Sequence, residues 1–341
     1  MIISASYKTD IPTFYGEWFI NRLQAGYCKM VNPYGRQIYT IDLTPAYVDG
    51  FVFWTKNVAP FLKYLPEIHE RGYPFIVQHT INGYPSQLES RVTNYAHTVE
   101  AMKRVASEYG AERLVWRYDP ILFTSLTPFE WHVQNFSILA KQLEGVTDEV
   151  VISFAEVYRK TKRNVELAAK EYDFTWDVHQ DEAFVLETGR SLATELVQIA
   201  ASHKMKLRIC SQKRFLVPGM IEEARCVDAD RLERVSGTQL DNKTRQKGNR
   251  KECGCYAAKD IGEYDTCPHG CVYCYAVHNR NMALERYKKH DPKGEFLFEP
   301  DGYSAGQEEE PKPTPIITVT KGKKSAPIVE QEMEQGTLFD V

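Results

Sequence analysis

The stretches Pro74-Phe-Ile-Val-Gln-His-Thr80 and Arg113-Leu-Val-Trp-Arg-Tyr-Asp119 decide the fold class. Both are short, apolar and rich in β-branched or aromatic residues, as buried strands are. A helical pattern over residues 91–109 separates them, and its apolar side chains share one face: Val92, Tyr95, Val99, Met102 and Val105. A strand, a helix and a second strand in this order predict two parallel strands joined by a crossover helix.

The same alternation extends in both directions from this unit. Six runs have the composition of buried strands, with helical patterns such as residues 191–201 between them: residues 2–6, 51–55, 74–80, 113–119, 149–155 and 206–210. Such a series is typical of an α/β fold with a parallel sheet, and it predicts a complete or partial TIM-type barrel, (β/α)6-like, over residues 1–210.

Composition narrows the class of protein. The chain has 341 residues, of which 43% are hydrophobic and 26% charged, which excludes a fibrous or largely disordered protein. No apolar run approaches the roughly 18 residues that span a bilayer, and residues 1–10 lack the features of a secretory signal. We therefore expect a cytoplasmic protein that does not contact membranes. The net charge of −4 argues against a uniformly basic nucleic-acid surface, although residues 241–251 form a local basic run. That run is either a phosphate-backbone contact or a solvated loop.

Eight cysteines are unevenly distributed, with seven between Cys210 and Cys274. In a reducing compartment this clustering favours metal binding or catalysis over disulfides. The string Asp265-Thr-Cys-Pro-His-Gly-Cys-Val-Tyr-Cys-Tyr-Ala276 places three of them at Cys-x3-Cys-x2-Cys spacing: Cys267, Cys271 and Cys274. Three thiolates hold three corners of an iron–sulfur cubane and leave one iron open, whereas a structural zinc site closes with four ligands. The alternative is a zinc knuckle in which His269, His278 or another cysteine is the fourth ligand.

This string resembles the cluster loop of radical S-adenosylmethionine (SAM) enzymes, in particular the spore photoproduct lyase-like branch. The chain also resembles the bacterial domain-of-unknown-function 1848 family, which shares the signature of residues 260–276. Three further strings echo the order of motifs in the lyase-like branch: Phe53-Trp-Thr-Lys-Asn57, Tyr84-Pro-Ser-Gln-Leu-Glu89 and Val115-Trp-Arg-Tyr-Asp-Pro120.

The resemblance implies an enzyme that binds a [4Fe–4S] cluster through Cys267, Cys271 and Cys274. It implies SAM as cofactor, a 5′-deoxyadenosyl radical, and hydrogen abstraction from a substrate that we expect to be DNA, for repair or modification. An electron donor such as flavodoxin or ferredoxin is also implied. Radical SAM proteins normally carry the cluster loop near the N-terminus, after the first strand, whereas here it follows all six predicted strands. We therefore expect a circularly permuted barrel with the loop at its C-terminal mouth. The alternatives are radical chemistry on RNA, a peptide or a small metabolite, and a zinc-stabilised nucleic-acid-binding protein without catalysis.

Four more cysteines lie close to the loop in sequence, within a cysteine-rich region, residues 211–300, that we expect to close the barrel. We predict that they form an auxiliary site, a second [4Fe–4S] cluster or zinc: Cys210, Cys226, Cys253 and Cys255. The alternative is that Cys210 and Cys226 are ordinary buried residues.

Several polar residues lie at or just after the C-terminal ends of predicted strands, where the active sites of parallel barrels are found. We expect Lys56, Arg117 and Asp119 to be catalytic, with Arg117 pairing with the SAM carboxylate and Asp119 binding a ribose hydroxyl or the substrate. Glu156, followed by Tyr158, is a cofactor-binding candidate, and Tyr273 is expected to pack over the cluster. The alternative for each is a supporting ion pair or a hydrogen-bonded rim position.

The chain changes character near its end. Residues 301–334 are rich in Pro, Gly, Lys and Glu, which predicts a disordered tether. Residues 335–341 begin with Gln335-Gly-Thr-Leu-Phe339, which resembles the pentapeptide that docks bacterial repair proteins on the sliding clamp. Leu338 and Phe339 would be apolar anchors and Gln335 a hydrogen-bonding group. The alternative is a frayed terminus.

Overall fold

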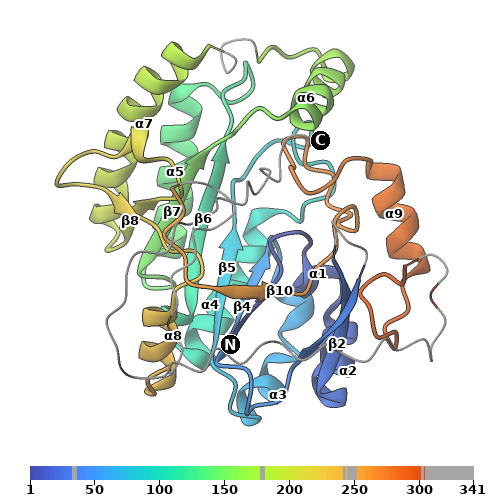
Figure 1. Ribbon diagram of the computed structural model, residues 1–341. Coiled ribbons are helices and arrows are strands. Elements are labelled where there is room, and N and C mark those ends of the chain that lie inside the picture. Colours follow the sequence, from blue (N-terminus) through green and yellow to red (C-terminus); the bar gives the residue numbers. More distant parts are fainter. Residues whose placement is uncertain (33–36, 177–180, 241–242, 244–251, 301–302, 304–341) are drawn as a thin grey trace, which may run out of the picture.

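The computed structural model describes residues 1–32, 37–176, 181–240, 243, 252–300 and 303. A single eight-stranded sheet runs through this part of the chain, in the order β10-β1-β4-β5-β6-β7-β8-β9, and every pair of neighbours is parallel (Figure 1). The strands are β1 (Ile2–Ala5), β4 (Gly50–Thr55), β5 (Phe75–Thr80), β6 (Leu114–Ile121), β7 (Glu149–Phe154), β8 (Lys206–Ile209), β9 (Glu222–Glu223) and β10 (Ala258–Asp260). All six strands that the sequence predicts are present in the sheet, which confirms the mixed α/β class.

The sheet is open. Among the described residues β9 and β10 each pair on one side only, so they form its two edges and no closed TIM-type barrel is present. Closure would require these edges to meet, yet β9 has two residues and β10 three. Both short strands, and a separate antiparallel hairpin of β2 (Tyr27–Val31) and β3 (Ile38–Asp42), lie outside the six predicted strands.

Nine α-helices connect and cover the strands of the described chain. They are α1 (Ile11–Phe14), α2 (Gly16–Ala25), α3 (Leu65–Glu70), α4 (Tyr95–Tyr109), α5 (Phe129–Leu143), α6 (Arg159–Tyr172), α7 (Glu182–Ser202), α8 (Ala229–Ser236) and α9 (Arg280–Lys289). N-terminal capping residues explain why two helices begin at other residues than the sequence predicts. Asn94 accepts a hydrogen bond from the Ala96 amide, so α4 begins at Tyr95 rather than at residue 91. Asp181 caps α7 in the same way, and this helix extends well beyond the predicted residues 191–201.

Both faces of the sheet are buried, as the continuous apolar runs of a parallel sheet require. On one face, aromatic side chains such as Phe51, Phe53 and Trp116 join the main core with helices including α2, α4, α5 and α7. On the other, Val52, Val115 and their neighbours pack against the cysteine-rich region, through residues such as Val227, Leu232 and Tyr256.

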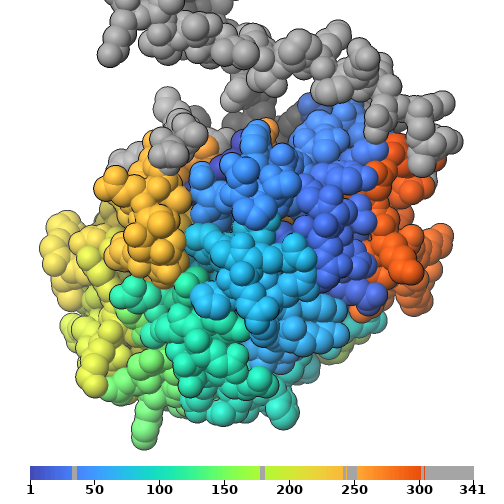
Figure 2. All heavy atoms as spheres, turned by 90° about the horizontal axis from the view of Figure 1, so that it is seen from below, coloured from blue at the N-terminus to red at the C-terminus, as the bar shows by residue number. Residues whose placement is uncertain are grey.

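The end of the described chain returns to its beginning. The backbone carbonyls of residues 292–294 accept hydrogen bonds from α2, including one of 3.0 Å from Trp18 Nε1 to Gly294. In Figure 2 the orange-red end of the described chain lies beside the blue N-terminal part. None of the described helices is both long enough and apolar enough to cross a membrane. The predicted tether over residues 301–334, apart from Tyr303, and the clamp-binding motif over residues 335–341 lie outside the described residues, as does the basic run of residues 241–251 apart from Lys243.

Candidate functional site

The three-cysteine loop, residues 265–276, follows β10 and is fixed to the end of β1. The Asp260 carboxylate accepts hydrogen bonds from Ser4 Oγ (2.8 Å), Ser6 Oγ (2.7 Å), the Tyr7 amide (3.0 Å) and the Gly262 amide (2.9 Å). A Cβ atom at Gly262 would lie 2.0 Å from Ser6 Oγ, so only glycine permits this close approach. The chain therefore leaves the sheet edge in one defined direction.

A second set of contacts ties the loop to the segment that follows β5. The Val272 amide donates to the Leu88 carbonyl (3.0 Å), the Arg91 amide donates to the His269 carbonyl (3.1 Å), and Glu89 forms an isolated antiparallel bridge with Cys271. These contacts place the loop at the C-terminal end of the parallel strands, where the sequence predicts it.

The thiols of this loop share one cavity. Cys267, Cys271 and Cys274 line a hollow of about 20 Å³ together with His269 and Arg280. Burial raises the pKa of Cys271 to about 12 and also raises the pKa of Cys267 and Cys274. Without a bound cation these thiols are therefore protonated, and a metal or cluster must displace their protons.

Three thiols on one loop are donors of the type that both iron–sulfur clusters and zinc ions bind. No three His, Cys, Asp or Glu side chains of the described chain surround one metal position. A cubane distributes its thiolates over separate irons, so that its ligand sulfurs stand further apart than those around one zinc ion.

Glu89 connects the loop to β4 through a buried polar group. Its carboxylate accepts from Lys56 Nζ (2.8 Å), from Asn82 Nδ2 (3.3 Å) and from the Tyr273 hydroxyl. Burial lowers the pKa of Lys56, but the negative charge of Glu89 outweighs it, so that the net pKa is raised and the ammonium stays charged. Burial and Glu89 raise the pKa of Tyr273, so its hydroxyl remains a donor.

The predicted residues Lys56 and Tyr273 are thus brought together beside the loop. Glu89, which joins them, was not among the predicted site residues. The only sequence signal for it is its position at the end of the motif over residues 84–89.

Arg117 lies next to the other cysteine group. Its Nε donates to Asp119 (3.1 Å), its Nη2 forms an ion pair with the same carboxylate, and its Nη1 donates to Cys226 Sγ (2.9 Å) and to Gln78 Oε1 (3.2 Å). Arg117 is 6% exposed, so this guanidinium is enclosed and engaged within the protein. Arg117 and Asp119 therefore pair with each other, and both lie within β6, which continues to Ile121, rather than at or just after the strand end as the sequence predicts.

Four further thiols form one contiguous group. The sulfur atoms of Cys210 and Cys226 are 3.3 Å apart, and Cys255 hydrogen bonds with both Cys226 and Cys253. The thiol of Cys255, by donating to Cys253, lowers the pKa of Cys253 to about 7. Tetrahedral zinc–thiolate geometry gives sulfur separations of about 3.8 Å, so Cys210 and Cys226 are in direct thiol contact rather than at zinc spacing.

All eight cysteines are free. Cys28, the eighth, is fully buried in β2, and burial raises its pKa to about 12.

Hydrogen bonds join the two cysteine groups. From Cys226 the path runs through Arg117 to Asp119, whose backbone carbonyl accepts from Asn82 Nδ2 (3.2 Å). The same Asn82 nitrogen donates to the Tyr273 hydroxyl (3.0 Å). A continuous chain of buried polar contacts therefore spans the ends of β5 and β6.

His269 and Glu156 occupy the remaining positions around the site. His269 Nε2 lies 2.7 Å from Asp10 Oδ2, while its Nδ1 is buried without a hydrogen-bond partner. Asp10, on the loop after β1, gave no signal in the sequence. Glu156 follows β7, as predicted, and accepts from the Tyr158 hydroxyl and from Gln212 Nε2 (3.5 Å).

The family model described as Domain of unknown function (DUF1848) matches residues 2–276. The chain belongs to this family. No curated protein and no solved structure gives a match. The DUF1848 match begins in β1 and ends at Ala276, the last residue of the three-cysteine loop, so it contains all eight strands of the sheet and all eight cysteines. Helix α9 and the chain beyond it lie outside the DUF1848 match.

Proposed function

We propose that this protein is a radical SAM enzyme whose open [4Fe–4S] cluster is held by Cys267, Cys271 and Cys274. The observation that carries the proposal is that three thiols of one loop line one cavity at the C-terminal end of a parallel sheet. Such a cluster, when bound, supplies the electron that cleaves SAM and so produces the 5′-deoxyadenosyl radical that takes hydrogen from the substrate.

The strand order supports a circularly permuted partial barrel. Strand β10, which leads into the cluster loop, is the last in the chain but lies at an edge of the sheet beside β1. Counted from β10, the strands follow the order of the chain from one edge to the other. A permuted (β/α)6-like core has this arrangement, with the cluster loop after its first strand.

The residues around the loop have roles that follow from their contacts. The Lys56 ammonium, held by Glu89, places a positive charge beside Cys271 and so favours thiolate at this position. Asn82, Glu89 and Tyr273 fix the loop backbone through hydrogen bonds in a buried setting that excludes water. These residues position the ligands and hold the reacting space closed to solvent.

We further propose that the Cys210, Cys226, Cys253 and Cys255 group holds an auxiliary cluster, [4Fe–4S] or zinc, and that the substrate is DNA. The chain of hydrogen bonds through Arg117 and Asn82 supports communication between the two cysteine groups. The predicted clamp-binding motif at Gln335, Leu338 and Phe339 supports action on DNA. A flavodoxin or ferredoxin is the proposed electron donor.

Anaerobic reconstitution of the full chain with iron and sulfide tests this proposal. We expect close to eight irons per chain if both cysteine groups hold cubanes and close to four if one does. Incubation with SAM and reductant should release 5′-deoxyadenosine, and Cys271→Ala should abolish this release. Cys28→Ala is the matched control, because this thiol lies in the β2 hairpin, apart from both groups. Stoichiometric zinc without iron, or equal 5′-deoxyadenosine release from wild type and Cys271→Ala, would contradict the proposal.

His269 favours a second candidate function, a zinc-stabilised nucleic-acid-binding protein. Its Nδ1 is unpartnered and the residue lines the cavity of the three cysteines, while its Nε2 contacts the Asp10 carboxylate. Metal-binding histidines commonly use their second nitrogen in this way. In this case protein purified without added iron should contain zinc, and both His269→Ala and Cys271→Ala should lose it.

A further inference from the structure

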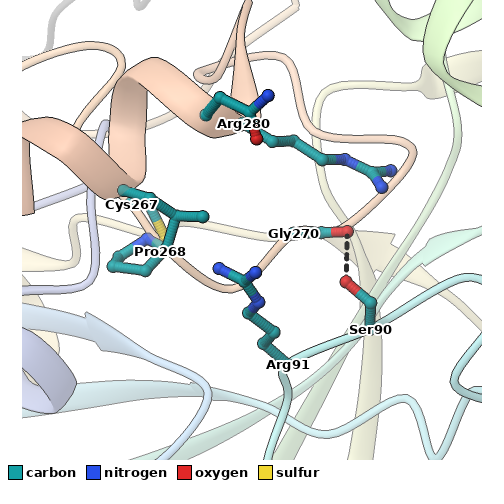
Figure 3. A pocket seen from close by; sticks show the side chains of 8 residues that line it. Ser90, Arg91, Cys267, Pro268, Gly270 and Arg280 are labelled. Atoms are coloured by element: carbon teal, nitrogen blue, oxygen red, sulfur yellow. Dashed lines mark hydrogen bonds between the residues drawn. The ribbon is translucent and has the colours of Figure 1, made fainter.

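A larger cavity, of about 200 Å³, lies beside the three-cysteine loop. Cys267 and Gly270 of the loop, Ser90 and Arg91 of the segment after β5, and Arg280 at the start of α9 all line it. Figure 3 shows Arg91 and Arg280 on different sides of the loop backbone at Gly270. Two guanidinium groups from separate elements therefore line one cavity next to a proposed cluster ligand.

Neither of these arginines is neutralised within the described chain. No carboxylate lines the cavity, and neither guanidinium has a hydrogen bond or an ion pair with another described residue. Arg280 Nη2 is buried and without a partner. A buried charged donor left without an acceptor is costly, so this arrangement favours an anion from outside the chain.

The start of α9 does not itself supply the positive potential. The side-chain oxygen of Asn279 already accepts hydrogen bonds from the amides of Asn281 (2.9 Å) and Met282 (3.1 Å). Any attraction for an anion at this position therefore comes from the arginine side chains.

We propose that this cavity binds a phosphate group of the substrate, held between Arg91 and Arg280. A carboxylate offers two oxygens in one plane and satisfies one guanidinium, whereas a tetrahedral phosphate offers oxygens to donors on different sides. The volume suits a phosphate with an adjoining sugar and is below the range for a whole drug-sized ligand, roughly 300–1,000 Å³. The rest of the substrate then extends past Cys267. This inference rests on the proposed function, since it takes the three-cysteine loop as the reaction centre.

Binding measurements on the full-length, anaerobically reconstituted protein test the proposal. The probes are a short fluorescent single-stranded DNA, the same strand with uncharged methylphosphonate linkages, and thymidine 5′-monophosphate as competitor. Arg91→Gln and Arg280→Gln should each weaken binding of the charged strand by roughly tenfold and lower the slope of log affinity against log salt by about one. Arg104→Gln is the matched control, because this arginine lies on the exposed face of α4 and pairs with Glu108.

The outcomes separate the source of the phosphate. Competition by the mononucleotide, lost in both arginine variants, indicates a free nucleotide; binding of the charged strand alone indicates a phosphodiester. Equal affinities for Arg91→Gln, Arg280→Gln and Arg104→Gln, or a wild type that binds neither probe, would overturn the proposal. Arg91 is exposed, and its side chain has no hydrogen bond or ion pair with another described residue, so Arg91→Gln reports on binding even if Arg280→Gln folds poorly. Failure of the radical SAM proposal is detected by a different measurement, because the wild type would then release no 5′-deoxyadenosine.

Discussion

Glu89 is the residue that holds the surroundings of the three-cysteine loop together. It is 6% exposed, and it is the common acceptor for Lys56, Asn82 and the Tyr273 hydroxyl. A buried carboxylate is stable only when its charge is compensated and its oxygens are hydrogen bonded, and Glu89 has both. Its partners come from three separate parts of the chain, so one side chain links the loop, through Tyr273, to the segments that follow β4 and β5.

Replacing Glu89 by Gln should therefore be strongly destabilising. The substitution leaves the Lys56 ammonium buried without a counter-charge, which typically costs about 3–5 kcal/mol. The double variant Lys56→Met/Glu89→Leu removes both charges and should recover much of this loss. Urea unfolding of the three proteins measures the effect. Glu100→Gln serves as control, because its pair with Lys103 on α4 is exposed and should matter by less than about 1 kcal/mol. A loss for Glu89→Gln no larger than for Glu100→Gln would show that Lys56 is not buried as a charge.

Residues of this site differ in how far the sequence reveals them. Lys56 and Arg117 were predicted because each stands at or near the end of an apolar strand, which a single sequence shows. Glu89 and Asp10 lie in irregular segments, where no periodicity marks a side chain as buried, and their partners are far away along the chain. Their importance follows only from the tertiary contacts.

At the scale of elements, β10 determines where the three-cysteine loop begins. The strand has three residues, and its position depends on parallel pairing with β1 and on the Asp260 carboxylate. Because the loop starts five residues after the strand ends, a displaced β10 would move the cysteines away from Glu89 and Lys56.

Asp260→Ala should consequently weaken both the fold and metal retention. The substitution leaves the two serine hydroxyls and two backbone amides without their acceptor, and we expect a loss of about 3 kcal/mol or more in the free energy of unfolding. Iron per chain after reconstitution should fall in parallel. The comparison is Asp42→Ala, which removes an exposed carboxylate whose hydrogen bonds within the described chain go to Thr44 in a turn, and it should cost less than about 1 kcal/mol. Unchanged stability and iron content in Asp260→Ala would show that the position of the three-cysteine loop does not depend on the Asp260 contacts of β10.

The six central strands could be predicted because each has a local apolar pattern, whereas β10 has none. Runs such as residues 74–80 and 113–119 are apolar on both faces, because the finished sheet is covered on both sides. The residues of β10, Ala258-Lys-Asp260, carry no such pattern, and β9 is a pair of glutamates. Edge strands of this kind take their conformation from their neighbours, so a local pattern does not reveal them.

At the scale of the molecule, parallel pairing explains how distant cysteines come together. All strands of the sheet end on the same side, so the segments after β8 and β10 project their thiols over one edge. From the sequence, only the position of the cluster loop at the C-terminal end of the strands was predicted in this way. Whether the sheet closes depends on the length and position of the edge strands, and with edges as short as β9 and β10 the described sheet does not close into a complete barrel.

The predicted clamp motif adds a test of how the whole chain is localised. If Leu338 and Phe339 are apolar anchors on a flexible tether, their loss should abolish retention on immobilised sliding clamp without altering the folded part of the chain. We expect full-length Leu338→Ala/Phe339→Ala to elute in the flow-through, whereas wild type is retained. The control Gln331→Ala/Met333→Ala truncates neighbouring side chains, one of them apolar, and should be retained like wild type. Urea unfolding midpoints of all three proteins should coincide, because the main core is formed within residues 3–297. Retention of the Leu338→Ala/Phe339→Ala protein equal to that of wild type would remove the clamp from the proposed partners and leave the assignment of DNA to rest on phosphate binding alone.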